Sequence, residues 1–359
     1  MFSGQIEVVG SFEQEPQLEP LMNHLLWLAP VVAALAFLLT WFLRRYALAR
    51  SLIDIPNARS SHSVPTPRGG GVAIVVSFLA ALPIFALCAD APPSGIWAFM
   101  GAGAAVALLG FLDDHGHIAA RWRLLGHFGA AVWMLFWLGG LPAISLPEMV
   151  VDLGWVGHVL AVFYLVWMLN LYNFMDGIDG LASVEAMCVC LGACLVYGLG
   201  DYPALIWMPL LLSMAVLGFL YWNFPRARIF MGDAGSGFLG LMLGGLSIAA
   251  AGLDTNLLWV WLILLGVFIV DATFTLSRRL LRGDKVYEAH RSHAYQFASR
   301  KAGGHFPVTL SVLVINLFWL TPIAIGVGVS GLNGLLGLVI AYAPLLVLAV
   351  KYKAGELET

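Results

Sequence analysis

Long apolar runs, separated by short polar segments, follow one another along almost the whole chain. A transmembrane helix needs about 17–25 predominantly apolar residues. Eleven runs approach or reach this length, at residues 21–43, 69–89, 96–112, 124–138, 156–171, 181–199, 203–222, 235–251, 257–276, 307–327 and 332–350. The pattern predicts an all-α protein, a polytopic membrane helical bundle of about 11 transmembrane helices. Residues 141–154 fit either a loop or a surface helix.

The positions of the basic residues predict how the helices cross the membrane. Lysine and arginine concentrate in cytoplasmic loops. With eleven helices and the N-terminus outside, all 18 Lys and Arg residues fall on the inner side, and the opposite segments carry only acids. A different number of helices would scatter the bases over both sides. The charge pattern therefore predicts an outside N-terminus and a cytoplasmic C-terminus.

The composition excludes an ordinary soluble domain and indicates an integral membrane protein. Of the 359 residues, 60% are hydrophobic and 11% are charged, and the mean hydropathy is +0.88. The 4 cysteines lie within apolar runs, which indicates small buried side chains and neither a disulfide framework nor a metal site. We predict an acidic N-terminal tail at residues 1–20, a single transmembrane catalytic domain at 21–351 and a cytoplasmic tail at 352–359.

Residues 170–180 form a polar helix end between two apolar runs. Asn173, Asp176 and Asp179 are spaced three apart, which on a helix places them on neighbouring rows of one face. Gly177 interrupts that helix and lets the backbone approach a ligand closely. Oxygen-bearing side chains beside a glycine turn suit a hard cation or a phosphate-bearing ligand. The alternative is a capped helix start with solvated acids.

A second polar cluster on the same side is the adjacent pair Asp113 and Asp114, followed by Arg121 and Arg123. Two carboxylates this close raise the pKa of one of them unless a cation relieves the repulsion. An ordinary solvated helix end is the alternative interpretation.

The third cluster, residues 230–237, joins the seventh and eighth predicted helices. Glycines flank Asp233, and Ser236 then opens a long apolar helix. The free N–H groups of that helix would face an anion, while Asp233 is suited to a divalent metal. A glycine-rich helix start also occurs for packing reasons alone.

The fourth cluster is the long basic loop at residues 278–305. His290, Arg291 and His293 supply donors suited to a diphosphate, which Arg binds through its planar fork. Arg278, Arg279 and Arg300 of the same loop suit contact with anionic lipid headgroups. In the first inner loop Arg68 adds a phosphate-compatible charge, with a topological anchor as the alternative.

Two more acids, Asp271 and Glu185, lie within predicted helices, where they belong either to a site or to a buried pair; a structural role is favoured for Glu185. The four clusters share one side and one membrane depth. This arrangement indicates phosphate chemistry between one soluble substrate and one substrate embedded in lipid.

These motifs resemble those of the polyprenyl-phosphate N-acetylhexosamine-1-phosphate transferase family over nearly the whole chain. The residues that carry the resemblance are Asp54-x-Pro56-Asn57, Pro67-Arg68-Gly69-Gly70, Asp113-Asp114, Asn170-x-x-Asn173-Phe174-x-Asp176-Gly177-x-Asp179-Gly180, Phe230-Met231-Gly232-Asp233-x-Gly235-Ser236, Asp271-Ala272 and the terminal histidine loop.

The resemblance implies an enzyme that moves a sugar 1-phosphate from a UDP-N-acetylhexosamine to undecaprenyl phosphate and releases UMP. It implies Mg2+, with Mn2+ as an alternative, and a multi-pass protein of the bacterial inner membrane with a cytoplasmic active site. Its partners would be the UDP-sugar, undecaprenyl phosphate and the lipid bilayer. No nucleic acid is expected, and a homodimer is left open.

The resemblance also assigns roles. Asp233 becomes the chief metal ligand, and Asp113 and Asp114 would act near the lipid phosphate. The expected residues are Asp113, Asp114, Asp176 and Asp179 for catalysis, Asp233 and Asp176 for the metal, and Arg68, Asn173, Gly235, Ser236, His290, Arg291 and His293 for substrate binding.

Residues 290–296 differ from the run of three histidines in the peptidoglycan branch of the family. They are more similar to the O-antigen initiating branch, whose donors include UDP-N-acetyl-fucosamine and UDP-N-acetyl-quinovosamine. The alternatives are a UDP-GlcNAc or peptidoglycan-precursor phosphotransferase, and, from another class, a secondary transporter, which would bind its substrate near the bilayer midplane between repeats.

Overall fold

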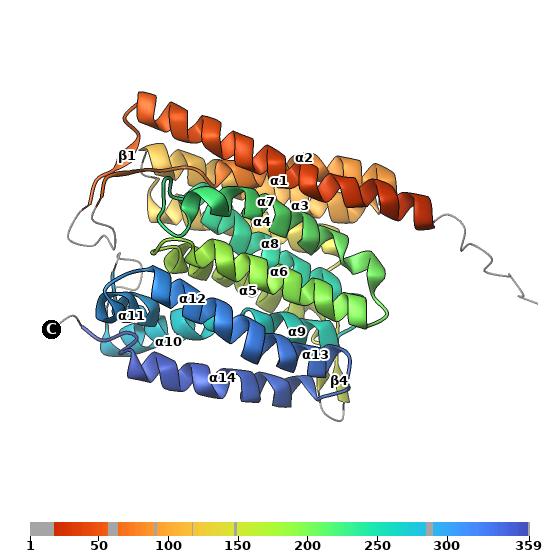
Figure 1. Ribbon diagram of the computed structural model, residues 1–359. Coiled ribbons are helices and arrows are strands. Elements are labelled where there is room, and N and C mark those ends of the chain that lie inside the picture. The colour runs from red at the N-terminus through yellow and green to blue at the C-terminus, as the bar shows by residue number, and fades with distance from the viewer. Residues whose placement is uncertain are drawn as a thin grey trace, which may run out of the picture.

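The computed structural model describes residues 18–56, 64–89, 92–116, 118–146, 149–284 and 290–357. Most of the predicted acidic tail therefore lies outside the described residues. The long helices lie side by side in one bundle with their axes roughly along one direction (Figure 1). The helices are α1 (Leu18–Ala49), α2 (Val72–Ala89), α3 (Pro93–Gly116), α4 (Ala120–Leu138), α5 (Gly154–Met175), α6 (Leu181–Leu199), η1 (Pro203–Leu205), α7 (Trp207–Asn223), α8 (Asp233–Ala251), α9 (Asn256–Leu264), α10 (Gly266–Arg282), α11 (Ala294–Ala302), α12 (Phe306–Ile315), η2 (Asn316–Leu320), α13 (Thr321–Gly328) and α14 (Gly334–Lys351).

The predicted polytopic helical fold is confirmed. Among the described residues, 9 spans are long and apolar enough to cross a membrane, and α9 and α10 together make a further, broken one. The remaining predicted span corresponds to α4, which has 19 residues and carries Arg121 and Arg123 in its first turn. Each of the eleven predicted segments is thus helical in the structure. Figure 1 places the start of α1 and the C-terminus at opposite ends of the bundle, as an odd number of crossings requires.

The structure corrects one detail of the prediction and decides another that the sequence left open. The apolar run at 257–276 is not one straight span, because α9 and α10 meet at an angle of 73°. Apolar residues continue from Leu264 across Leu265 to Val267 at the bend, so the apolar pattern could not locate it. The predicted loop or surface helix at 141–154 contains an antiparallel hairpin, β3 (Ile144–Leu146) with β4 (Met149–Val151), and its described residues before α5 form no helix, which favours the loop. Its β-branched residues favour extended backbone.

Helix α8 forms the centre of the bundle. In α8, 94% of the membrane-spanning residues are buried, more than in the other candidate spans of the described chain. Neighbouring helices can pack close to the backbone of α8 because this helix is rich in glycine. A Cβ atom at Gly240 would lie 2.3 Å from the carbonyl oxygen of Met168 in α5. The fold therefore fixes α8, and with it Asp233 at its first residue, against its neighbours.

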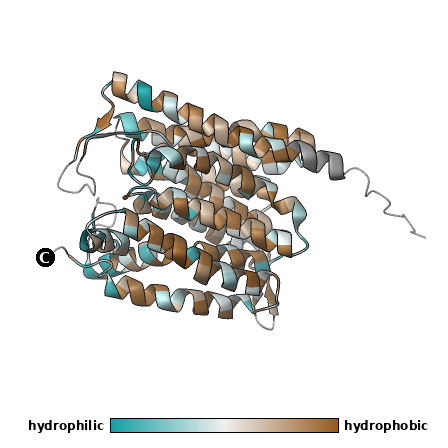
Figure 2. Ribbon diagram, viewed as in Figure 1, coloured by the Kyte–Doolittle hydropathy of each residue, from teal (hydrophilic) through white to brown (hydrophobic). Residues whose placement is uncertain are grey.

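Hydrophilic residues gather at one end of the bundle, the end that also carries the C-terminus (Figure 2). Five segments meet there: the hairpin of β1 (Ile53–Asp54) and β2 (Thr66–Pro67), the end of α3 with Asp114, the α5–α6 turn, the α7–α8 loop and the α10–α12 region. The four clusters predicted from the sequence therefore lie at one end of the molecule.

The packing of α8 predicts that alanine substitutions at two glycines one turn apart differ in their effect on stability. Gly240→Ala should lower the free energy of unfolding by about 1–3 kcal/mol, because the new methyl group would overlap backbone atoms that cannot move aside. Gly237→Ala is the matched control, since its Cβ would meet side chains at an ordinary 3.5 Å. Thermal unfolding of the two variants in detergent tests this; equal stability would contradict the packing argument.

Candidate functional site

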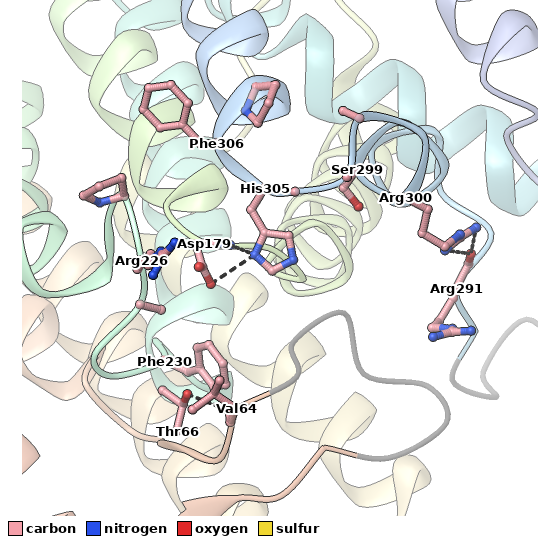
Figure 3. A pocket seen from close by; sticks show the side chains of 16 residues that line it. Val64, Thr66, Asp179, Arg226, Phe230, Arg291, Ser299, Arg300, His305 and Phe306 are labelled. Carbon is pink, nitrogen blue, oxygen red and sulfur yellow. Dashed lines mark hydrogen bonds and ion pairs between the residues drawn. The ribbon is translucent and has the colours of Figure 1, made fainter.

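Two neighbouring cavities that share lining residues lie at the polar end of the bundle. The inner cavity has a volume of about 220 Å3 and is lined by Asp54, Arg68, Asn173, Asp176, Gly177, Ile178, Asp179, Asn223, Phe230, Gly232, Asp233, Gln296 and His305. The outer cavity, of about 1140 Å3, shares Asp179, Phe230 and His305 with it. In Figure 3 Asp179 and His305 point toward each other, while Arg291 and Arg300 lie farther along the outer cavity.

Arg68 joins two carboxylates at the start of α8. Its Nη2 atom lies 2.7 Å from Oδ1 of Asp233 and 2.8 Å from Oδ1 of Asp114. Burial lowers the pKa of Arg68, but Asp233 and Asp114 outweigh it, so the pKa lies above its ordinary value. Arg68 is therefore a fixed cation beside the inner cavity.

Asp114 supports the backbone of α8. Its Oδ1 accepts a hydrogen bond of 3.2 Å from the N–H of Asp233, and its side chain is 4% exposed. A carboxylate at this position also interacts favourably with the positive end of the α8 dipole. The structure thus places Asp114 behind the inner cavity, where it holds Asp233 in place.

Asp113 turns toward α4. It accepts a hydrogen bond of 2.8 Å from the N–H of Ile118 and forms an ion pair with Arg123. Nη1 of Arg123 is also 3.8 Å from Oδ2 of Asp233. Asp113 is consequently linked to the inner cavity through Arg123.

The α5–α6 turn supplies the opposite wall of the inner cavity. Asn173 donates a hydrogen bond of 2.9 Å to Oγ of Ser236, which ties α5 to α8. Nδ1 of His305 lies 3.3 Å from both the backbone nitrogen and Oδ1 of Asp179. Gly180 has a φ of +73°, in the left-handed region that favours glycine, and its N–H donates to Oδ1 of Asn223 at 3.0 Å. The glycine turn therefore aims its acids into the cavity.

The inner cavity carries more acidic than basic groups. Four aspartates line it, Asp54, Asp176, Asp179 and Asp233, against Arg68 and His305. Burial raises the pKa of Asp176 well above its usual range, and the nearby Asp233 carboxylate raises it further. An excess of carboxylates in a recessed site suits a divalent cation with oxygen ligands. Asp176 and Asp233 are the residues suited to hold one, although in the described ranges no three His, Cys, Asp or Glu side chains already form a ligand set.

Gly235 and Ser236 have structural contacts. A Cβ atom at Gly235 would lie 2.6 Å from Cα of Gly71, so glycine is needed there for α8 to pack against the start of α2. Oγ of Ser236 donates to the carbonyl oxygen of Gly232 at 3.2 Å and is buried. These two predicted substrate-binding residues shape the α8 start from behind the cavity wall.

The histidine loop is held by Asp271, which lies in α10. The carboxylate accepts hydrogen bonds from the N–H groups of Ala294 at 2.9 Å and Tyr295 at 3.0 Å, at the start of α11. Nδ1 of His293 lies 3.3 Å from the same carboxylate, and the His293 ring is buried in a stack with His290 and Tyr295. Of the two roles that the sequence left open for Asp271, these contacts support the buried partner.

The structure therefore separates the predicted substrate-binding residues of this loop. Arg291 lines the outer cavity, while the rings of His290 and His293 stack on each other and line neither the inner nor the outer cavity. Sequence reasoning missed Gln296 and His305, which reach the inner cavity. His305 carried a signal, because it follows two glycines directly and comes just before the predicted helix start at Pro307. Nothing in the sequence near Gln296 distinguishes it.

Glu185 has the structural role that its position favoured. It is fully buried, and Nδ2 of Asn316 donates to its Oε2 at 2.7 Å. Asn316 is the first residue of the π-helical segment η2, so this pair joins α6 to the irregular part of the α12–α13 span.

Comparison with known proteins independently supports the family resemblance seen in the sequence motifs. The family described as "Glycosyl transferase family 4" matches residues 96–251. The chain is similar to a probable undecaprenyl-phosphate N-acetylglucosaminyl 1-phosphate transferase of Bacillus subtilis, with 31% identity over 78% of this chain and 78% of the relative. It is 31% identical to a decaprenyl-phosphate N-acetylglucosaminephosphotransferase of Mycolicibacterium smegmatis, over 82% and 79%. A phospho-N-acetylmuramoyl-pentapeptide-transferase of Synechococcus elongatus is 35% identical over 58% of each chain.

The contacts of Asp271 predict that this residue orders the histidine loop. Asp271→Ala should speed tryptic cleavage at the α10–α11 loop and at α11, because two N–H groups at the α11 start would lose a charged acceptor. Limited proteolysis in detergent, with the fragments identified by mass, measures this.

Asp254→Ala is the control, since Asp254 follows the far end of α8 and accepts from Tyr202. Cleavage of the loop at the wild-type rate in Asp271→Ala would contradict the assigned role.

Proposed function

Since this chain belongs to glycosyl transferase family 4, the polyprenyl-phosphate N-acetylhexosamine-1-phosphate transferases, we propose that it transfers a sugar 1-phosphate from a UDP-N-acetylhexosamine to undecaprenyl phosphate. In this reaction an oxygen of the lipid phosphate attacks the β-phosphorus of the donor. The bond between that phosphorus and the bridging oxygen breaks, and UMP leaves with the bridging oxygen.

The observation that carries this proposal is the meeting of acids and bases at one membrane-proximal cavity. Phosphoryl transfer depends chiefly on positioning and on stabilisation of spread negative charge. The inner cavity offers Arg68 and His305 among four carboxylates, next to an outer cavity that contains Arg226, Arg291 and Arg300. The outer cavity, of about 1140 Å3, has room for a nucleotide sugar.

Mg2+ held by Asp233 and Asp176 would supply neutralisation of the donor diphosphate. The chain's own residues do the remaining work. Arg68 holds Asp233 and adds positive charge, Asn173 links the two walls of the cavity, and His305 positions Asp179. A phosphate monoester with a second pKa of about 6 is already largely dianionic at neutral pH, so the acceptor needs little help from a base.

The membrane setting is that of a multi-pass protein of the bacterial inner membrane. The concentration of all 18 Lys and Arg residues in the segments predicted to lie on the inner side supports a cytoplasmic active site. A secondary transporter fits less well, because the described cavities that contain the acids lie at the bundle end, whereas transporters bind substrate near the midplane.

For the sugar, the loop His290-Arg291-Ser292-His293-Ala294-Tyr295-Gln296 supports a donor of the O-antigen initiating branch, such as UDP-FucNAc or UDP-QuiNAc. The enzyme would then start the synthesis of O-antigen or another surface polysaccharide. A second candidate is UDP-GlcNAc, which the names of the Bacillus and Mycolicibacterium relatives favour.

A panel of UDP-sugars tests the proposal directly. Purified protein with undecaprenyl phosphate and Mg2+ should release UMP with at least one UDP-N-acetylhexosamine, and we expect the highest kcat/KM with a 6-deoxy sugar. Release of UMP from UDP-GlcNAc alone would select the second candidate. No UMP from any donor, in protein that is folded and monodisperse, would rule out the transferase activity.

Asp233→Asn should lower kcat about 10²- to 10³-fold without unfolding the protein, because it removes one charge from the inner cavity at nearly constant volume. Transfer rates and thermal unfolding are measured together. Asp254→Asn, at the far end of α8, is the matched control and should retain wild-type turnover. Near-normal turnover in Asp233→Asn would overturn the assignment of this residue.

A further inference from the structure

A small recess lies between α3, α4, α5 and α8, next to the inner cavity. Its volume is about 20 Å3, and its polar lining includes Arg123 and His127 from α4. It shares Asn173 and Asp233 with the inner cavity. The recess is thus a side branch of the site whose far wall is formed by α4.

His127 is the unusual member of this lining. His127 is 6% exposed, and its Nδ1 atom is buried without a hydrogen-bond partner among the described residues. A buried polar atom that lacks a partner costs free energy, so native structures usually supply one from protein, water or ligand. The imidazole ring lines a recess and has a hydrogen-bonding capacity that the described chain leaves unused.

The recess lies deeper in the membrane than the inner cavity. His127 is four residues farther into α4 than Arg123, and Gly237 is four residues farther into α8 than Asp233, which at 1.5 Å per residue is about 6 Å in each case. Leu169 adds an apolar wall at the same depth in α5. This depth suits a phosphate group whose molecule is anchored in the bilayer.

The size of the recess limits what can enter. A volume of about 20 Å3 holds about one water-sized oxygen atom. A phosphate group is larger, but the adjoining inner cavity has about 220 Å3 for its remaining atoms. One phosphate oxygen in the recess and the rest of the group in the inner cavity fits both volumes.

We propose that His127 binds the phosphate of the lipid-linked acceptor. An imidazole N–H would donate a hydrogen bond to one phosphate oxygen in this recess. The inference rests on the proposed function and adds to it a residue of the acceptor site. Arg123, one turn away on the same face of α4 and paired with Asp113, also lines the recess and adds a positive charge there. The donor nucleotide would occupy the opposite side, near Asp179 and His305.

The test compares His127→Leu, which removes the N–H group, with His127→Gln, which keeps one. The KM and kcat are measured separately for UDP-sugar and for undecaprenyl phosphate. His127→Leu should raise the acceptor KM about tenfold and leave the donor KM within twofold, and His127→Gln should recover most of the loss. His158→Gln is the matched control, because His158 lies near the other end of α5 and accepts from the N–H of Leu141.

Binding without turnover gives a second readout. Wild-type protein should bind a short-chain polyprenyl phosphate more tightly than the matching polyprenol, and His127→Leu should lose most of that difference. If His127→Leu does not fold, His127→Met serves as the apolar variant. This binding assay tests the role of His127 even if the wild type releases no UMP. The absence of UMP release would count against the proposed function alone.

Three results would overturn the inference. An acceptor KM within twofold of wild type in the apolar variant would mean that the recess holds only water. A rise confined to the donor KM would assign the bound phosphate to the UDP-sugar. An unchanged preference for polyprenyl phosphate over polyprenol would show that His127 does not contact the phosphate.

Discussion

The start of α8 is the position on which the site depends, because a helix that is buried along its whole length must satisfy its first N–H groups locally. In a bilayer every backbone polar group needs an internal partner. Asp114 provides one for the N–H of Asp233, and Arg68 then balances the two carboxylates that meet there. The same arrangement that stabilises the helix end also fixes the orientation of Asp233 at the cavity wall.

This requirement explains why acids that look alike in the sequence have different roles in the structure. Asp114 and Asp271 each accept two backbone N–H groups at a helix start, and both are largely buried. Asp176 and Asp233 instead line a cavity whose excess negative charge the described protein groups only partly balance. The first pair holds the helices that carry the site, and the second pair offers charge to a cation or substrate.

The transmembrane helices and the grouping of the polar motifs could be predicted because both follow from composition along the chain. Apolar length marks each helix, and the one-sided distribution of Lys and Arg brings the motifs to one end. The individual roles could not be predicted, since they depend on tertiary contacts. Gly235 has the spacing of an anion-binding glycine, yet it faces Gly71. His305 reaches the site only because α12 packs against α6 beside Asp179.

The two substrates of such an enzyme differ in where they can travel, and the cavities differ in the same way. The outer cavity carries Arg226, Arg291 and Arg300 in loops and a short surface helix, where a soluble anion can reach them. The recess beside His127 lies a helical turn into the bundle and is partly apolar. Asp233 lines both the inner cavity and the recess. A phosphate from the membrane side and a diphosphate from the water side would therefore meet at the one acid whose position the buried helix determines.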